Sequence, residues 1–392
     1  MHGCHEGSHA AGWTGTGVTI AVIDSQLNLQ VPTLAGADIE LPSSVACTAT
    51  EGQEISPTST DFSASHATNV VSLIVGSGVG YLGQPGVKGV APGAKILFFA
   101  VGGSTPGDSP DEMMCNGDSV DASAVSTAVA GGAQIISVSL GIDSSPDLIA
   151  AIAAAKRAGV VVLGALPNET TGETGAPSGN FPAAANGVVT VQAIGADNAI
   201  EETDGKPNVF PLTKTDIAGP GIALLTQGSS DPNTREGVTI GDGTSYATPI
   251  IAGFLAMVKQ KYPAATGNQL IQTLIHNTGT GTGTGNHPPA RDAKGEVGYG
   301  LVSLDHMLEV NPTTDPDVNP LISTESEQTP TAQELGWSPS ASSSAPARTA
   351  SEVELRSWFL PAVTGGVAIL VLTLLFLAVV TRRKKRAISL ES

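Results

Sequence analysis

The sequence predicts an α/β fold built on a mostly parallel sheet. Short β-branched runs, typical of buried parallel strands, alternate along the chain with segments of helical apolar character. The expected strands cover residues 17–24, 95–101, 134–141 and 160–164, and the expected helices cover 65–76, 119–130, 146–159, 245–261 and 267–277. Strands that alternate with helices pair in parallel through right-handed crossovers. The length of 392 residues, 41% of them hydrophobic, allows one large core and further segments.

Charge and cysteine content narrow the class of protein. The chain carries 18 basic and 36 acidic side chains, for a formal net charge of −18. Residues 382–386 are all basic, so the body of the chain is more acidic still. Nucleic-acid phosphates need cationic contacts, and we therefore expect no nucleic-acid partner. The three cysteines (Cys4, Cys47 and Cys115) are too few for a disulfide framework and form no C-x-x-C pair.

Residues 1–11 are interpreted as an N-terminal remnant. They contain neither a basic segment nor an apolar segment, so the sequence as written carries no signal peptide. His2, Cys4, His5 and His9 could suggest a metal site, but their spacing fits no standard zinc pattern. We therefore expect no metal ion at this end of the chain.

Three polar residues lie where an α/β fold places catalytic groups. Asp24 ends the first expected strand, and sites in open α/β sheets form at the carboxyl ends of strands. His66 begins the first expected helix, where it would face the same cleft as Asp24. Ser245 follows a Gly-Thr turn at the start of another helix, near free backbone N–H groups and the positive end of the helix dipole. Each of these residues, taken alone, also fits an ordinary turn or helix-cap position.

Taken together, the motifs around these residues resemble those of subtilisin-like serine proteases. The serine lies in the pattern G-T-S-x-A-x-P-x-x-A-G, the histidine lies in H-x-T-x-V, and the aspartate ends the run that follows Trp13–Gly17. Other segments that resemble this family are 89–94 (G-V-A-P-x-A), 137–141 (S-x-S-L-G), 180–191 and 216–221. The resemblance covers residues 12–310. It implies a subtilisin-like peptidase domain, with a mostly parallel central sheet and helices on both faces.

The resemblance also implies a role for each active side chain. Ser245 would attack the peptide carbonyl, and His66 would take its proton and return it to the leaving amine. Asp24 would orient His66 and stabilise the imidazolium. Asn168, which follows the expected strand at 160–164, would hold the oxyanion together with the backbone N–H of Ser245.

The substrate implied by the resemblance is a polypeptide. Ser139, Leu140 and Gly141 would offer their backbone groups to an extended peptide, as an added strand at the edge of a sheet. The same residues also read as the end of a core strand, and both interpretations can hold. The family's chemistry implies no metal ion and no cofactor.

Three positions depart from the family pattern and leave two functions open. Gln26, Ala67 and Pro167 stand where the family usually has glycine. The first function is an active serine endopeptidase. The second is a catalytically impaired, membrane-anchored subunit that keeps the fold and stabilises a secretion complex. A third reading, a purely structural α/β domain, would leave all four active side chains as coincidence.

The C-terminal part of the sequence predicts a membrane anchor. Residues 311–351 are rich in Pro, Ser and Thr without a hydrophobic period, and they are interpreted as a flexible linker. Residues 358–380 contain no charge and are long enough to cross a bilayer as a helix. The residues at 381–392 form a basic tail, which the positive-inside rule places in the cytoplasm, with Trp358 at the outer interface.

This order of segments resembles the mycosins, the membrane-anchored proteases of actinobacterial type VII secretion systems. The resemblance implies a single-pass protein of the cell membrane with an extracytoplasmic catalytic domain, and a type VII secretion membrane complex as a partner. Export of the domain requires a signal, so we expect a true start codon upstream of Met1. In an oxidising compartment we also expect a disulfide between Cys47 and Cys115, which lie in polar loops on either side of the His66 segment.

Overall fold

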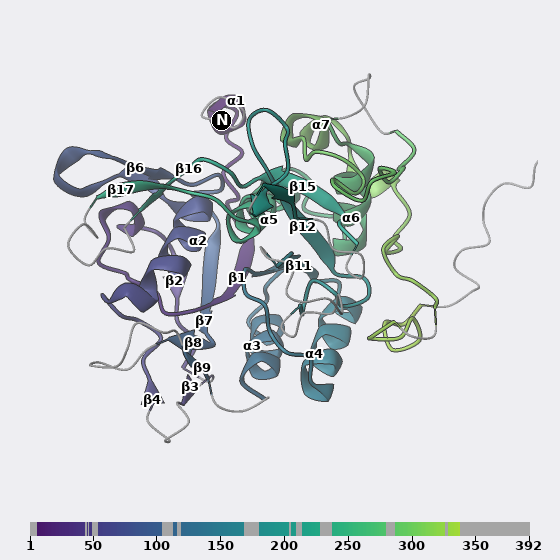
Figure 1. The fold of residues 1–392 in the computed structure, drawn as a ribbon. Coiled ribbons are helices and arrows are strands. Elements are labelled where there is room, and N and C mark those ends of the chain that lie inside the picture. Colours follow the sequence, from purple (N-terminus) through teal and green to yellow (C-terminus); the bar gives the residue numbers. More distant parts are fainter. Residues whose placement is uncertain are drawn as a thin grey trace, which may run out of the picture. The chain divides into compact units, whose positions relative to one another are not determined.

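A seven-stranded parallel sheet forms the centre of the protein in the computed structural model (Figure 1). The strands lie in the order β15-β12-β11-β10-β1-β7-β2, and every neighbouring pair is parallel. Their bounds are Thr19–Asp24 (β1), Ile39–Glu40 (β2), Lys95–Ala100 (β7), Ile135–Val138 (β10), Val161–Ala165 (β11), Val189–Ile194 (β12) and Ile217–Pro220 (β15). The predicted α/β fold with a mostly parallel central sheet is confirmed.

The structure describes residues 6–43, 45, 47–48, 54–103, 113–115, 119–167, 180–203, 205–208, 214–227, 237–279, 287–325 and 328–337. The chain divides into two units, 1–338 and 339–392, and all described residues belong to the first. Within these described ranges, no helix is both long enough and apolar enough to cross a membrane. The predicted span at 358–380 and the basic tail at 381–392 lie outside the described residues.

Helices cover both faces of the sheet, because its strands are apolar on both sides. Successive side chains of a strand point to opposite faces. In β1, Ile20 and Val22 therefore join one core with helices α2, α5, α6 and α7, while Ala21 and Ile23 join a second core with α3 and α4. The bounds are Ser65–Val75 (α2), Ser119–Ala130 (α3), Pro146–Arg157 (α4), Thr244–Lys261 (α5), Gly267–His276 (α6) and Leu304–Glu309 (α7).

The helix boundaries follow local capping chemistry. At the start of α4, the Ser145 side chain accepts a backbone N–H hydrogen bond, and Pro146 occupies the first turn. The same helix ends before Gly159, whose φ of 78° is a left-handed conformation that favours glycine. Thr266 and Gln269 form a capping box at the start of α6. These signals are local, and the five helices expected from the sequence begin and end within two residues of the observed bounds.

Short elements surround the central sheet. The two-stranded antiparallel pairs are β3–β4 (Cys47–Thr48 and Glu54–Ile55), β5–β6 (Ser77–Val79 and Pro85–Lys88), β8–β9 (Gly102–Gly103 and Met113–Met114), β13–β14 (Glu202–Thr203 and Lys206–Pro207) and β16–β17 (Leu224–Gln227 and Val238–Gly241). Short 3₁₀ helices cover Pro32–Leu34, Phe62–Ala64, Tyr81–Gly83 and Pro312–Thr314. Helix α1 (Glu6–Ala10) packs against the domain through His9, whose Nε2 lies 2.7 Å from the Val90 carbonyl oxygen. The packed part of the chain therefore begins before the expected boundary at residue 12.

A disulfide joins Cys47 in β3 to Cys115, with the two Cα atoms 5.1 Å apart. The predicted pairing is confirmed. The loop that this bond closes contains α2 and hence His66. Cross-linking a long loop restricts the unfolded chain, so the bond stabilises the part of the fold that carries the histidine.

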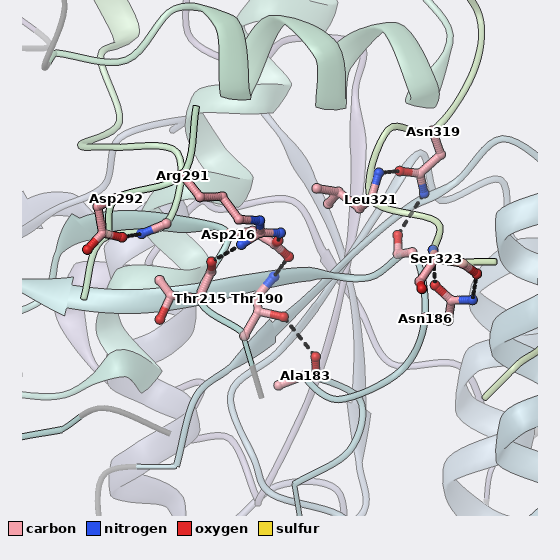
Figure 2. Close-up of polar contacts among 12 residues, drawn as sticks. Ala183, Asn186, Thr190, Thr215, Asp216, Arg291, Asp292, Asn319, Leu321 and Ser323 are labelled. Carbon is pink, nitrogen blue, oxygen red and sulfur yellow. Dashed lines mark hydrogen bonds and ion pairs between the residues drawn. The ribbon is translucent and has the colours of Figure 1, made fainter. Parts of the chain in front are cut away.

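Asp216, just before β15, anchors the segment that follows α6. Its buried carboxylate accepts a hydrogen bond from the Thr190 N–H at 2.9 Å and pairs with the Arg291 guanidinium, as Figure 2 shows. Burial raises the pKa of Asp216, and the charge of Arg291 acts in the opposite direction. Arg291 also donates to the Thr215 carbonyl oxygen. The pair therefore holds the chain after residue 287 against the edge strand of the sheet.

The residues after α7 form a packed C-terminal arm (residues 311–325 and 328–337), and the expected flexible linker is wrong for this part. The arm lies beside the turn that leads into β12 (Figure 2). There the Asn186 side chain donates to the carbonyl oxygens of Ser323 and Pro330 at 2.9 and 3.0 Å, and its Oδ1 accepts from the Ser323 N–H at 2.8 Å. Asn319 donates to the Gly187 carbonyl oxygen at 2.8 Å.

The composition of the arm explains why a linker was expected. Its contacts are hydrogen bonds between asparagine side chains and main-chain groups, and these need no apolar period. Gly187 has a φ of 77°, and a Cβ there would stand 3.0 Å from the Asn319 Nδ2, so the close approach needs glycine. Leu335 is buried, and Arg157 at the end of α4 donates to the Glu334 carbonyl oxygen. The remaining residues of the expected linker, 338–351, lie outside the described residues.

Replacing Asn186 with alanine should loosen the arm and destabilise the domain. The change removes three side-chain hydrogen bonds and leaves main-chain groups of the half-buried Ser323 and the buried Pro330 without these partners. We expect Asn186→Ala to lower the free energy of unfolding in urea by about 2–4 kcal/mol. Gln333→Ala, at an exposed position of the same arm, is the matched control and should change it by less than about 0.5 kcal/mol. Equal, small effects of both variants would show that the arm does not support the fold.

Candidate active site

The structure brings Asp24 and His66 into direct contact. Asp24 ends β1 and is fully buried, and His66 is the second residue of α2, with 26% of its side chain exposed. The Asp24 Oδ1 lies 2.7 Å from the His66 Nδ1 and also accepts the Ser25 N–H at 2.8 Å. An ionised carboxylate only accepts hydrogen bonds, so Nδ1 carries the proton in this pair. The neutral imidazole then presents Nε2 as an acceptor, which is the state that a general base requires.

Ser245 lies at the start of α5, as the sequence predicted. It is the second residue of the helix, after Thr244. Gly243 occupies the N-cap position with a φ of 149°. Its Oγ donates to the Ser139 carbonyl oxygen at 3.0 Å, and the Ser139 hydroxyl donates to the Ser245 carbonyl oxygen at 2.9 Å. Tyr246, the next residue, stacks on the His66 ring with the centroids 6.3 Å apart. The start of α5 therefore lies beside the Asp24–His66 pair.

Pro249 explains the reciprocal contact between the two serines. In an α-helix, the N–H of this residue would donate to the carbonyl oxygen four residues earlier, which belongs to Ser245. Proline has no N–H, so that carbonyl oxygen is left without its helical donor. The Ser139 hydroxyl supplies the missing hydrogen bond. Sequence reasoning placed Ser139 only as a backbone contact for substrate and missed this supporting role, although the S-x-S-L-G motif contains the residue.

Besides Ser139 at the end of β10, residues that follow two further strands hold the start of α5. Thr244 donates through Oγ1 to the Leu166 carbonyl oxygen just after β11. The Gly243 N–H donates to the Gly221 carbonyl oxygen just after β15 at 2.8 Å. A Cβ at Gly221 would stand 2.6 Å from the Ala193 Cβ and 2.8 Å from the Gly243 carbonyl oxygen, so this close approach needs glycine. The helix N-terminus therefore sits at the carboxyl edge of the sheet.

The other residues predicted for the site have different outcomes. Asn168 lies outside the described residues, and the described chain of that loop ends with Leu166 and Pro167 after β11. Leu140 and Gly141 follow β10 directly, with Leu140 half-buried and Gly141 exposed. Their contact with a substrate, and the oxyanion role of Asn168, stay predictions. Within the described ranges, no group of three His, Cys, Asp or Glu side chains is placed to hold a metal ion.

Gln26, which replaces a family glycine, is built into the fold beside Asp24. Its side chain is 2% exposed, donates to the Ser56 carbonyl oxygen at 2.8 Å and accepts from the Ser63 hydroxyl at 2.6 Å. A Cβ at Gly103 would stand 2.5 Å from the Gln26 side chain. The glycine at residue 103 thus provides the space that Gln26 fills. Gln26 in turn connects the end of β1 to the segment that leads into α2.

Ala67, the second departure, is fully buried in the core that α2 shares with α5. It points into this core from the residue after His66, while the contact between His66 and Asp24 is intact. Neither Gln26 nor Ala67 therefore separates the two side chains of the pair.

Comparisons with known proteins point to one family. The model of the subtilase family matches residues 15–300. The major intracellular serine protease of Bacillus subtilis (strain 168) is 31% identical over 195 residues, which cover 50% of this chain and 54% of that protein. The M-protease of Shouchella clausii (strain KSM-K16) is 29% identical over 71% of this chain and 63% of its own length. This chain thus spans between half and two thirds of the length of these two relatives.

Solved structures support the same fold. Fervidolysin from Fervidobacterium pennivorans, described as a keratinolytic enzyme related to subtilisin, superposes with a TM-score of 0.55 at 23% identity. The match covers 79% of this chain and 45% of that structure. The prenylagaramide maturation protease PagA superposes with a TM-score of 0.52 at 21% identity, over 77% of this chain and 96% of its own. At these identities the likeness concerns the fold alone.

The contact between Gln26 and Gly103 predicts that mutations at the two positions are coupled. Gly103→Ala should destabilise the domain by about 1–3 kcal/mol, because the new methyl group overlaps the buried Gln26 side chain. In a Gln26→Gly background the same substitution should cost at least about 1 kcal/mol less. Thermal and urea unfolding of the four proteins measure this coupling. Gly7→Ala, where a Cβ would meet nothing within 4 Å, is the control, and strictly additive effects would contradict the proposed contact.

Proposed function

Because the chain belongs to the subtilase family, we propose that it is a serine endopeptidase whose reacting groups are Ser245, His66 and Asp24. The observation that carries the proposal is the hydrogen bond of 2.7 Å between His66 and the buried Asp24, with the start of α5 beside them. The pair is the general base that a serine nucleophile needs. Ser245 lies at the start of α5, beside this pair.

The proposed reaction proceeds through a covalent intermediate. The Ser245 hydroxyl turns from the Ser139 carbonyl oxygen to His66, whose Nε2 takes the proton as Oγ attacks the carbonyl carbon of a peptide bond. His66 then gives this proton to the leaving amine, and the C–N bond breaks to leave an acyl-enzyme. A water molecule, deprotonated by His66 in the same way, attacks the acyl carbon. The bond from this carbon to the Ser245 Oγ then breaks, His66 returns the proton to Oγ, and the carboxylic acid product leaves. Asp24 stabilises the imidazolium in both halves of the reaction.

Negative charge that develops on the carbonyl oxygen would be held at the N-terminus of α5. The first N–H groups of a helix have no carbonyl partner within it, and the helix dipole is positive at this end. The Ser245 N–H is one of these groups and is proposed as one oxyanion donor. Asn168 is proposed as the second donor, on its position after β11 in the sequence. The contacts from the ends of β10, β11 and β15 hold the start of α5, and so keep the Ser245 N–H in place before the substrate arrives.

The proposed substrate is an extended polypeptide. Residues 139–141 continue from β10 at the carboxyl edge of the sheet, and Gly141 is exposed there. An extended peptide that pairs with this backbone would place its scissile bond beside Ser245, since Ser139 already contacts Ser245. Backbone pairing of this kind binds peptides of many sequences.

We further propose that the peptidase is a mycosin-type protein, anchored in the cell membrane and associated with type VII secretion. Support comes from the uncharged run at 358–380 and the basic residues 382–386 that follow it. The disulfide between Cys47 and Cys115 fits an oxidising compartment, which is consistent with an extracytoplasmic domain. The acidic character of the chain fits a soluble, well-hydrated domain outside the membrane. Upstream residues that carry an export signal are part of this proposal.

Ser245→Ala tests the enzymatic proposal. The purified wild-type domain should react with a fluorophosphonate probe and cleave a denatured polypeptide, and the variant should lose both activities by several orders of magnitude. Its melting temperature should stay near that of the wild type, because alanine keeps the helix and its carbonyl contact with Ser139. Activity that survives in Ser245→Ala would refute the assignment. A wild-type domain that neither reacts nor cleaves would favour the catalytically impaired subunit.

Protease treatment of intact protoplasts tests the membrane topology. We expect the added protease to remove the folded domain and leave a small membrane-bound fragment that carries a C-terminal epitope tag. Moving the charges at 382–386 across the bilayer is unfavourable, so the tag should resist digestion until the protoplasts are lysed. A domain that is fully protected in intact protoplasts would contradict the extracytoplasmic location and the mycosin assignment together.

A further inference from the structure

We propose that Tyr246 is a positioning residue, which holds the His66 imidazole against the start of α5 and couples the two helices that carry the base and the nucleophile. The inference rests on the proposed function of His66 and Ser245. Tyr246 takes no part in making or breaking bonds. Its side chain lies beside His66, Gly241 and Asn69.

The tyrosine ring stacks on His66. The two rings are stacked, with an interplanar angle of 28° and centroids 6.3 Å apart. Aromatic pairs with centroids 4.5–7 Å apart attract each other in offset arrangements of this kind. Asp24 holds the imidazole through Nδ1 at one edge of the ring. The tyrosine face adds a restraint of another kind, because it limits tilting of the imidazole about that hydrogen bond.

The tyrosine ring also packs against the β16–β17 hairpin. A Cβ at Gly241 in β17 would stand 2.7 Å from the Tyr246 Cε2 and 3.2 Å from the Thr226 Cγ2. Tyr246 therefore fills the space that the missing side chain of Gly241 leaves free. The ring thus contacts both the hairpin and the imidazole, so a displacement of the ring would disturb the position of His66 as well.

The hydroxyl group of Tyr246 is held by the helix that carries His66. Asn69, one turn after His66 on α2, is a polar neighbour of this hydroxyl and interacts with it. The Asn69 Oδ1 accepts the Gln227 N–H of β16 at 2.7 Å, and its side chain is buried. Asn69 thus joins α2, α5 and the hairpin in one polar contact. The histidine helix cannot shift along α5 without breaking it.

The arrangement also bears on the charged state of the base. During the proposed reaction His66 becomes an imidazolium, and the face of an aromatic ring favours a neighbouring cation. The charges of Asp24 on β1 and Asp242 after β17 act on Tyr246, and Tyr246 itself stays neutral because burial raises its pKa. Loss of the tyrosine ring should therefore disfavour the imidazolium and lower the pKa of His66.

Two substitutions separate the contributions of the ring and the hydroxyl. Tyr246→Leu removes the stacked face, and Tyr246→Phe keeps the face but breaks the contact with Asn69. We expect Tyr246→Leu to lower kcat by about 10–100-fold with KM within about twofold, since a misplaced catalytic group costs rate more than binding. Tyr246→Phe should lower kcat by less, about 2–5-fold. In the pH profile of kcat/KM, the acidic limb should move to lower pH for Tyr246→Leu and stay in place for Tyr246→Phe.

The control is the other tyrosine at α5. Tyr262 lies at the far end of the helix, and its hydroxyl donates to the Leu308 carbonyl oxygen at 2.9 Å. Tyr262→Leu should lower the melting temperature while kcat and the pH profile stay unchanged. A purely structural role of Tyr246 would give this same result for Tyr246→Leu and would overturn the inference.

A titration of His66 by NMR gives a readout that needs no turnover. The His66 pKa should be lower in Tyr246→Leu than in the wild type, and Ser245→Ala can serve as the background for both. If Tyr246→Leu does not fold, an unchanged kcat in Tyr246→Phe would overturn the coupling through Asn69. Activity in Ser245→Ala would refute the proposed function, whereas an inactive Ser245→Ala with unperturbed Tyr246 variants would refute only the positioning role.

Discussion

The hydrogen bonds that fix the first turn of α5 at the carboxyl edge of the sheet are the constraint on which the site depends. A helix that contains proline in its second turn loses the donor for one carbonyl oxygen, and here that oxygen belongs to Ser245. The Ser139 hydroxyl restores the bond from the end of β10, and Thr244 reaches the end of β11. The proline therefore has a structural consequence of its own. Because it has no N–H, the Ser245 carbonyl oxygen is free to accept the hydrogen bond that attaches the end of β10 to the serine.

The parts of the structure that could be predicted are those with local or periodic signals in the sequence. Buried strands, capped helices and the motifs around Asp24, His66 and Ser245 fall in this class, and the structure pairs the first two residues. The packing of the C-terminal arm was missed, because asparagine side chains and main-chain groups hold it without any apolar period. The stacking of Tyr246 on His66 was missed for a related reason. It joins residues far apart in the chain through a contact that no local pattern encodes.

Gln26 shows how a motif can lose a residue type while the geometry stays in place. The family usually has a glycine at this position. In this chain a larger buried side chain occupies the space, and the glycine that accommodates it lies at position 103, on another strand. The two positions are distant in sequence and adjacent in space. The effect of a substitution in a family motif therefore depends also on the residue that packs against the substituted position.

The C-terminal arm determines where a mechanical load on the chain would act. Its contacts with Asn186 and Gly187 lie before β12, at the amino edge of the sheet, whereas Asp24 and Ser139 lie at the carboxyl edge. Tension applied beyond Trp337 would first strain the Arg157–Glu334 contact and then the bonds of Asn186. While these bonds hold, the load acts on α4 and on the turn before β12, and not along the chain that leads back to α7 and α5. A domain held by its C-terminal end could thus be pulled without distorting the carboxyl edge, where the proposed chemistry takes place.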